Sequence, residues 1–164
     1  MIYSREVIDP VEIMARKKQG VQFLVRPLEE KELDEMTRVW VDADLPYRPK
    51  GRDSPEELRA QLRRSPDLFI GAFDGQKMIG AVIATDDGRK GWINRLAVLP
   101  SHRRMGVGEA LVKVCEDALR KRGRSIFSIH IEGRNAASEG LFLKSGYNDA
   151  SYIRYYVKRD DEDV

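Results

Sequence analysis

The chain is poor in features that mark several large classes of protein. Among its 164 residues there is a single cysteine, Cys115, which excludes an internal disulfide and is typical of a reducing cytoplasm. No apolar run approaches the ~20 residues needed to cross a bilayer, and residues 1–6 do not resemble the apolar core of a signal peptide. We therefore expect a cytoplasmic protein with no membrane partner.

Neither sign of charge dominates the composition. Lysine and arginine number 29 and aspartate and glutamate number 27, so the net charge of +2 gives no general attraction to nucleic acid. Internal repeats and low-complexity linkers are also absent from the sequence. The length fits one domain with a sizeable core. We expect an N-terminal extension over residues 1–20, a single domain over 21–159 and an acidic tail over 160–164.

The most informative segment is residues 103–108, which read Arg-Arg-Met-Gly-Val-Gly. It follows a strand-like run at 92–98 and precedes a helix that begins at Val107 and carries apolar residues at three- and four-residue steps. Glycines let backbone N–H groups approach an anion, and the positive end of the helix dipole points at the same place. The pattern predicts a site for a phosphorylated ligand. A nucleotide-phosphate site is the weaker alternative, because no Gly-Lys-Ser/Thr follows the loop.

A second segment, residues 135–147, reads Asn-Ala-Ala-Ser-Glu-Gly-Leu-Phe-Leu-Lys-Ser-Gly-Tyr. Together the two segments resemble the GNAT superfamily of acyl-CoA-dependent N-acyltransferases. In that family the loop binds the CoA pyrophosphate, and the strand before it pairs with the pantetheine arm. The resemblance covers roughly the second half of the chain and implies acetyl-CoA as the acyl donor. It also implies a set of cofactor-binding residues: Leu96, Ala97, Val98, Arg103, Arg104, Met105, Gly106, Val107, Gly108, Glu109, Asn135, Ser138 and Phe142.

The chain departs from the family at the position of the usual general acid. Phe142 stands where relatives commonly have a tyrosine, and a phenyl ring cannot donate a proton. A leaving thiol, with an ordinary pKa of about 8.5, needs less protonation than an alkoxide or an amide nitrogen, so an acid is useful but dispensable. Tyr147 and the later tyrosines of the chain are alternative donors, and the sequence favours none of them.

The candidate general base is His130, five residues before Asn135, where relatives that acetylate protein N-termini often carry a glutamate. Imidazole titrates near neutral pH, which suits removal of a proton from an amine. A structural histidine in a strand is an equally open interpretation, and Glu132 on the same face is an alternative base. The resemblance further implies that the backbone N–H of Val98 holds the carbonyl oxygen of the thioester.

The acceptor side is expected at the irregular segment 42–53, which follows the first helix. Its three aspartates, Asp42, Asp44 and Asp53, could attract a cationic amine, whereas its basic residues would equally welcome an acid. The sequence therefore leaves the acceptor open. No metal ligand is expected. The sequence leaves the oligomeric state open, with a homodimer as one alternative.

Periodicity and turn residues predict the order β-α-α-β-β-β-α-β-α-β-β, a mixed α/β (α+β), mainly antiparallel sheet with helices on both faces. The resemblance implies the same, GNAT-like fold. A Ser-Pro-Glu-Glu sequence at 54–57 predicts the start of the second helix. The last two strands are expected around Tyr147 and residues 153–157. The resemblance thus implies an N-acetyltransferase that moves an acetyl group from acetyl-CoA to a primary amine of a small molecule or protein. The alternative is a CoA-binding sensor or regulatory module with lost or weak turnover.

Overall fold

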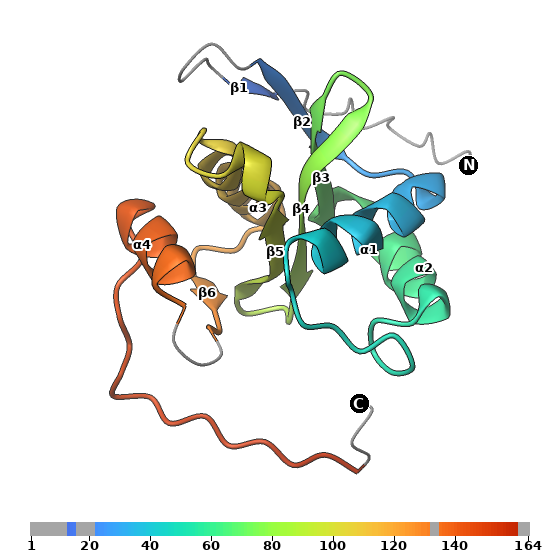
Figure 1. Cartoon of the computed structure of the whole chain (residues 1–164). Helices are drawn as coiled ribbons and strands as arrows, with labels where there is room; N and C mark the ends of the chain where they lie inside the picture. Colours follow the sequence, from blue (N-terminus) through green and yellow to red (C-terminus); the bar gives the residue numbers. More distant parts are fainter. Residues whose placement is uncertain (1–12, 16–21, 132–134, 161–164) are drawn as a thin grey trace, which may run out of the picture.

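Among the residues that the structure describes, 13–15, 22–131 and 135–160, six strands form one sheet (Figure 1). In this computed structural model the strands lie side by side in chain order. Neighbouring strands are antiparallel except for β5 and β6, which are parallel. The strands are β1 (Ile13–Ala15), β2 (Phe23–Pro27), β3 (Phe69–Asp74), β4 (Lys77–Asp86), β5 (Gly91–Val98) and β6 (Phe127–Ile129).

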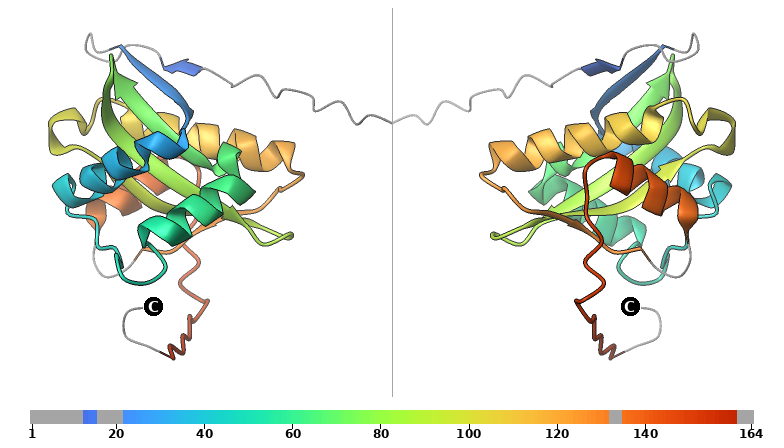
Figure 2. Two further views of the ribbon diagram at one scale, coloured as in Figure 1. Left: turned by 90° about the vertical axis from the view of Figure 1, so that its right-hand side faces the viewer. Right: turned by 90° about the vertical axis from the view of Figure 1, so that its left-hand side faces the viewer.

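Helices cover both faces of this sheet (Figures 1 and 2). On one face lie α1 (Leu33–Asp42) and α2 (Pro55–Arg64), and on the other lie α3 (Val107–Lys121) and α4 (Ala136–Lys144). Short 3-10 turns precede three of the elements: η1 (Glu30–Glu32), η2 (Pro66–Leu68) and η3 (Pro100–His102). Helix α3 forms the crossover between the parallel strands β5 and β6, as a parallel pair requires.

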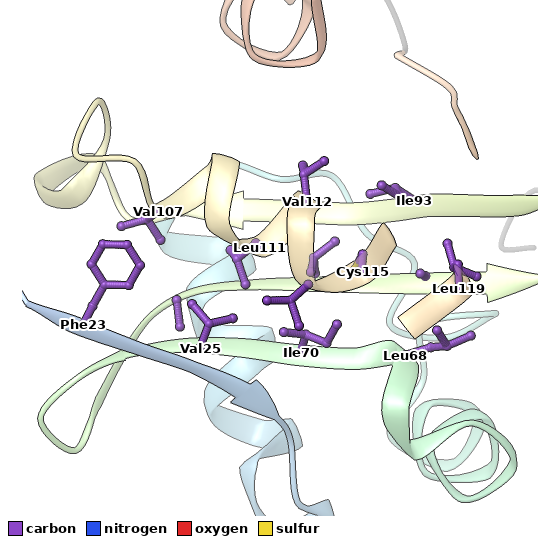
Figure 3. Close-up of a cluster of buried hydrophobic side chains, with 14 of the residues drawn as sticks. Phe23, Val25, Leu68, Ile70, Ile93, Val107, Leu111, Val112, Cys115 and Leu119 are labelled. Atoms are coloured by element: carbon purple, nitrogen blue, oxygen red, sulfur yellow. The ribbon is translucent and has the colours of Figure 1, made fainter. Parts of the chain in front are cut away.

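Each face has its own buried cluster. Under α3 the apolar side of the helix packs on β2 to β5, with Leu111, Cys115 and Leu119 completely buried (Figure 3). Under α1 and α2 the second cluster is built around Trp40 and Met36, which are also completely buried. The sheet is therefore held from both sides, and its strand ends are free to form a site.

Several local predictions are confirmed. Helix α2 begins after Ser54, whose Oγ accepts a hydrogen bond from the Glu57 N–H at 3.3 Å, and Pro55 is its first residue. Helix α3 begins at Val107 and ends before Gly123, which has a φ of +80°. The mixed, mainly antiparallel sheet with helices on both faces is the predicted fold class.

At the N-terminal end, residues 13–15 of the expected extension form β1, which pairs with β2. The expected terminal strands are wrong: residues 148–160 contain no strand, and Tyr152, Tyr155 and Tyr156 are exposed. The physical reason is that β-propensity makes a strand only where a neighbouring edge pairs with it. Here the chain turns instead, with the Ile153 N–H bonded to the Ala150 carbonyl oxygen at 2.8 Å.

Candidate active site

The site begins where β5 and β6 part. The two strands pair at only three positions, Gly91 with Phe127, Trp92 with Ser128 and Ile93 with Ile129. Beyond Ile93, β5 continues for five residues to Val98 without a partner on that side. The described strands therefore form a fork that opens toward the N-terminus of α3, and the free edge of β5 lines it.

A β-bulge lies on the free part of β5. Between Ala81 and Ile83 of β4, the partner on β5 moves from Ala97 to Asn94, so β5 carries one extra residue. Arg95, inside the bulge, has a φ of +48°, which is uncommon for a residue with a side chain. The bulge re-aims the peptide groups that follow it.

The peptide group of Val98 faces the fork. The Leu99 N–H donates to the Ile79 carbonyl oxygen at 2.9 Å, which makes Gly80 and Val98 a non-hydrogen-bonded pair of the antiparallel ladder. In such a pair the N–H and C=O groups point away from the partner strand, here away from β4 and toward the side of β6. The Val98 carbonyl oxygen accepts a hydrogen bond from Arg103 Nε at 3.2 Å. The N–H of Val98 is thus directed into the opening, where the predicted oxyanion donor would be needed.

The N-terminus of α3 lies at the mouth of the same fork. Gly106, its N-cap, has a φ of +86° and no capping side chain. Beyond Gly106 itself and its two chain neighbours, no described heavy atom lies within 4 Å of the place where a Cβ would stand. The first helical hydrogen bond runs from the Ala110 N–H to the Gly106 carbonyl oxygen at 3.0 Å, so the N–H groups of residues 107–109 have no acceptor within the helix. This terminus fits a diphosphate group, because it offers free N–H donors and the positive end of the helix dipole.

Most of the other predicted loop residues make contacts within the protein. The guanidinium of Arg103 donates to the Ala43 carbonyl oxygen at 3.1 Å as well as to Val98, and so ties the loop to the end of α1. Arg104 is exposed with a φ of +63°, while Met105 packs against the α3 cluster and Val107 is buried. Arg104 is therefore the basic side chain of this pair that remains available to an anion.

Close packing against α4 requires a small residue at position 108, which the sequence alone does not show. A Cβ there would stand 3.0 Å from Leu141 Cδ2 of α4. The neighbouring Glu109 forms an ion pair with Lys144, also of α4. Both residues therefore join α3 to α4, and Gly108 allows the two helices to approach closely where the predicted cradle begins.

The predicted residues of α4 divide into a cap and a core contact. Asn135 is the N-cap, and its Oδ1 accepts a hydrogen bond from the Ser138 N–H at 3.1 Å. Phe142 is 6% exposed and lies edge-on to Tyr147, with ring centroids 5.1 Å apart. The Tyr147 hydroxyl donates to Glu116 Oε1 at 3.0 Å. Its pKa is raised, mainly by burial and also by the negative charge of Glu116. Neither aromatic side chain offers a free proton donor to the fork.

His130 follows β6 directly, at the level where β5 and β6 separate. Its exposed ring lies between those of Trp92 and Tyr155, at centroid distances of 4.8 and 4.6 Å. The Trp92 indole N–H donates to Asp87 Oδ2 at 2.9 Å. This hydrogen bond is the largest cause of the lowered pKa of the Asp87 carboxyl, which is about 2. The structure thus brings the candidate base to the fork as part of an aromatic stack. The alternative base, Glu132, lies outside the described residues.

Sequence reasoning missed the most strongly bonded polar contact near the fork. Arg95 of the bulge binds Asp53 through two hydrogen bonds, Nε to Oδ1 at 3.1 Å and Nη2 to Oδ2 at 2.6 Å. Asp53 is 5% exposed, and its Oδ2 also accepts from the Arg48 N–H at 2.7 Å. The suggestion that Asp53 attracts a cationic amine is therefore wrong, because Arg95 already neutralises its charge. No local signal links these residues, which lie 42 positions apart.

Other candidate chemistries find no support among the described residues. Cys115 is completely buried, and this burial, with the adjacent Glu116, raises the pKa of its thiol, as expected for a structural cysteine. Within the described ranges no three His, Cys, Asp or Glu side chains gather in a way that could hold a metal ion. The helices of that part of the chain are also too short or too polar to span a membrane.

Comparison with known proteins agrees with this geometry. The profile of the Acetyltransferase (GNAT) family matches residues 28–147. An acetyltransferase of Sodalis glossinidius is 27% identical over 139 residues, covering 85% of this chain and 96% of that protein. Since the family match spans most of the chain, the protein belongs to the acetyltransferase (GNAT) family.

Solved structures share the fold. The aminoglycoside 6′-N-acetyltransferase AAC(6′)-IG from Acinetobacter haemolyticus superposes with a TM-score of 0.66 at 20% identity, covering 84% of this chain and 99% of that one. An N-acetyltransferase from Thermoplasma acidophilum, solved in complex with coenzyme A, gives a TM-score of 0.65 at 19% identity, with coverage of 74% and 87%. At these identities the likeness concerns the fold, and the acceptor has to be argued from this chain.

Proposed function

We propose that the protein is an N-acetyltransferase that transfers an acetyl group from acetyl-CoA to a primary amine of a small molecule or protein. The observation that carries the proposal is the open N-terminus of α3 at Gly106, placed at the mouth of the β5–β6 fork. The N–H groups of residues 107–109, and the exposed Arg104 beside them, would hold the diphosphate of the donor. Family membership and the CoA-bound neighbour from Thermoplasma support acetyl-CoA as this donor. The buried, reduced cysteine favours the cytoplasm.

Two groups of the chain would assist the transfer. Acetyl-CoA supplies a thioester whose carbonyl carbon accepts the amine and whose sulfur leaves as a thiol. The Val98 N–H, directed into the fork, would donate a hydrogen bond to the carbonyl oxygen as negative charge develops on it. His130, where the strands separate, would take the proton of the amine directly or through a water molecule. The thiolate needs little protonation, so a buried Phe142 in the place of an acid does not prevent the reaction.

Calorimetric titration with acetyl-CoA tests the cofactor site. The variant Gly106→Glu places a carboxylate where the diphosphate would lie, and we expect its affinity to fall at least about tenfold, or 1.4 kcal/mol. The matched control is Gly123→Glu at the other end of α3, because Gly123 has nearly the same φ, +80°, and equally open surroundings. This control reproduces the backbone strain without touching the cradle. Equal binding by wild type and Gly106→Glu, or binding by neither, would end the proposal.

A second candidate function is a CoA-binding sensor or regulatory module. The burial of Phe142 favours it, because a phenyl ring cannot donate a proton and the hydroxyl of the neighbouring Tyr147 is bonded to Glu116. The two functions differ in product. If acetyl-CoA binds while thiol release stays at the background rate across a broad panel of amines and peptides, the sensor is the better description. Amine-dependent thiol release above background establishes the enzyme.

A further inference from the structure

The segment from Pro46 to Asp53 forms a loop that closes on one side chain of the β5 bulge. Arg95 Nη1 donates to the Pro46 carbonyl oxygen at 2.7 Å, while the rest of its guanidinium binds Asp53. Inside the loop, the N–H groups of Gly51 and Asp53 donate to the Arg48 carbonyl oxygen at 3.0 and 3.1 Å. Both ends of the segment are therefore anchored to the same guanidinium, and we call residues 46–53 the anchored loop.

The anchored loop itself carries more basic than acidic side chains. Its acidic residue, Asp53, is buried and neutralised by Arg95. Its three basic side chains, Arg48, Lys50 and Arg52, are exposed, and none makes a hydrogen bond or ion pair with any group in the described part of the chain. Asp42 and Asp44 lie before the loop, at the end of α1 that Arg103 ties to the phosphate loop. The anchored loop thus presents three exposed cations, with exposed carboxylates before it (Asp42 and Asp44) and after it (Glu56 and Glu57).

The anchored loop also lies beside the fork. Arg95 sits in the bulge, three residues before Val98 on the free part of β5. Tyr47 packs edge-on against Trp40, with ring centroids 5.9 Å apart, which keeps the loop on the sheet face that α1 and α2 cover. The cradle at α3 is on the opposite face. An acceptor that reaches the fork from the side of α1 and α2 therefore approaches on the face to which the anchored loop belongs.

We infer that the anchored loop selects acceptors that carry acidic groups near the reacting amine. This inference rests on the proposed acetyl transfer and names the class of its acceptor. The shared chemistry is a primary amine with one or more carboxylates close by, as in a peptide whose free N-terminus is followed by acidic residues, or in a small dicarboxylic amino acid. Exposed cations attract such groups by long-range electrostatics that salt screens. Arg48, Lys50 and Arg52 are specificity-determining residues, and the amine itself is left to groups in the fork.

The test measures binding separately from turnover. Two C-terminally labelled tetrapeptides with free N-termini, Ala-Glu-Glu-Ala and Ala-Lys-Lys-Ala, are titrated with the CoA-saturated protein by fluorescence anisotropy. We expect the acidic peptide to bind at least about tenfold more tightly, with the preference shrinking as salt rises from about 0.05 to 0.5 M. The triple variant Arg48→Gln, Lys50→Gln, Arg52→Gln should lose this preference. Competition by free glutamate separates the two sources: displacement at low millimolar concentration indicates a small acceptor, and its failure indicates a peptide.

A matched variant controls for net charge. Arg64→Gln, Lys77→Gln, Lys121→Gln removes three exposed cations at the end of α2, on the β3–β4 hairpin and at the end of α3, all outside the anchored loop. This control should keep the preference for the acidic peptide. Equal affinity for the two peptides, or a preference that survives in the anchored-loop variant, overturns the inference. Thiol release from acetyl-CoA in parallel samples tests the proposed function separately: acidic preference without release refutes only the transfer, and release with both peptides equally refutes only the acidic class.

Discussion

The ion pair between Asp53 and Arg95 should stabilise the fold far more than the surface pairs of this protein. The side chains of the two residues are 6% and 18% exposed, and two hydrogen bonds join them. Asp53→Asn keeps the shape of the side chain but leaves a guanidinium that is largely buried without its counter-charge. Removing one partner of a buried pair costs about 3–5 kcal/mol. Because Arg95 keeps its bond to Pro46 and retains some contact with water, we expect the lower end, about 3 kcal/mol.

Urea unfolding followed by tryptophan fluorescence measures this loss. A domain of this size has a free energy of unfolding of about 5–15 kcal/mol, so a loss of about 3 kcal/mol shifts the midpoint clearly. The double variant Asp53→Asn, Arg95→Gln should recover part of the loss, which gives a coupling energy of about 2 kcal/mol between the two sites. Burial should account for this loss, so an exposed ion pair of similar geometry provides the comparison.

Glu30 and Arg63 form that exposed pair. Arg63 Nε and Nη2 donate to Glu30 Oε2 and Oε1 at 3.0 and 2.9 Å, but the side chains are 42% and 67% exposed. Water solvates both charges when the pair is broken, so Glu30→Gln should leave the unfolding midpoint almost unchanged. If Asp53→Asn is as stable as wild type, or if the two variants lose the same amount, burial is not what gives the Asp53 pair its strength.

Three further predictions concern the side chains of Leu111, Cys115 and His130. Leu111→Ala, at a completely buried position under α3, should lower the free energy of unfolding by about 3 kcal/mol in urea, and a loss below about 1 kcal/mol would mean that the cluster closes over the cavity. The raised pKa of Cys115 keeps its thiol neutral in the folded state, whereas the unfolded chain ionises it from about pH 8.5. The stability that the neutral thiol contributes is therefore complete below that pH and is lost as pH rises, by up to about 1.4 kcal/mol per pH unit. The free energy of unfolding of Cys115→Ala should lack this decrease between about pH 9 and 10. Parallel decreases in wild type and variant would contradict the assignment. His130→Ala should reduce the rate by about 10²-fold at neutral pH, with a loss that shrinks as pH rises, and an unchanged pH profile would leave His130 as a stacking residue only.

The predictable parts of this protein are those encoded by neighbouring residues. The start of α2 follows from Ser54 and Pro55, because a hydroxyl cap and a proline at the first helical position act within one turn. The start of α3 follows from Gly106, since a left-handed residue before a helix favours glycine. The link from these local patterns to the acetyltransferase fold was supplied by family resemblance, and the family match confirms it.

The parts that could not be predicted depend on contacts between distant residues. The charge balance of the anchored loop depends on Arg95, which neutralises Asp53 from a strand 42 positions away in the sequence. The sequence predicts Gly108 as part of the anion cradle, whereas the position of Leu141 gives its small size a packing reason as well. The run of tyrosines after residue 150 has the composition of a strand, but in the described structure residues 148–160 pair with no neighbouring strand.

The short pairing of β5 with β6 has a consequence for how the molecule opens. Strand β6 is held by three paired positions and has no partner on its other side among the described strands. By contrast, β4 pairs with both of its neighbours along most of its length. Amide hydrogens of β6 should therefore exchange with solvent much faster than those of β4, through local openings that leave the central strands intact. Opening of this single peripheral strand should therefore cost only a small fraction of the free energy that maintains the fold.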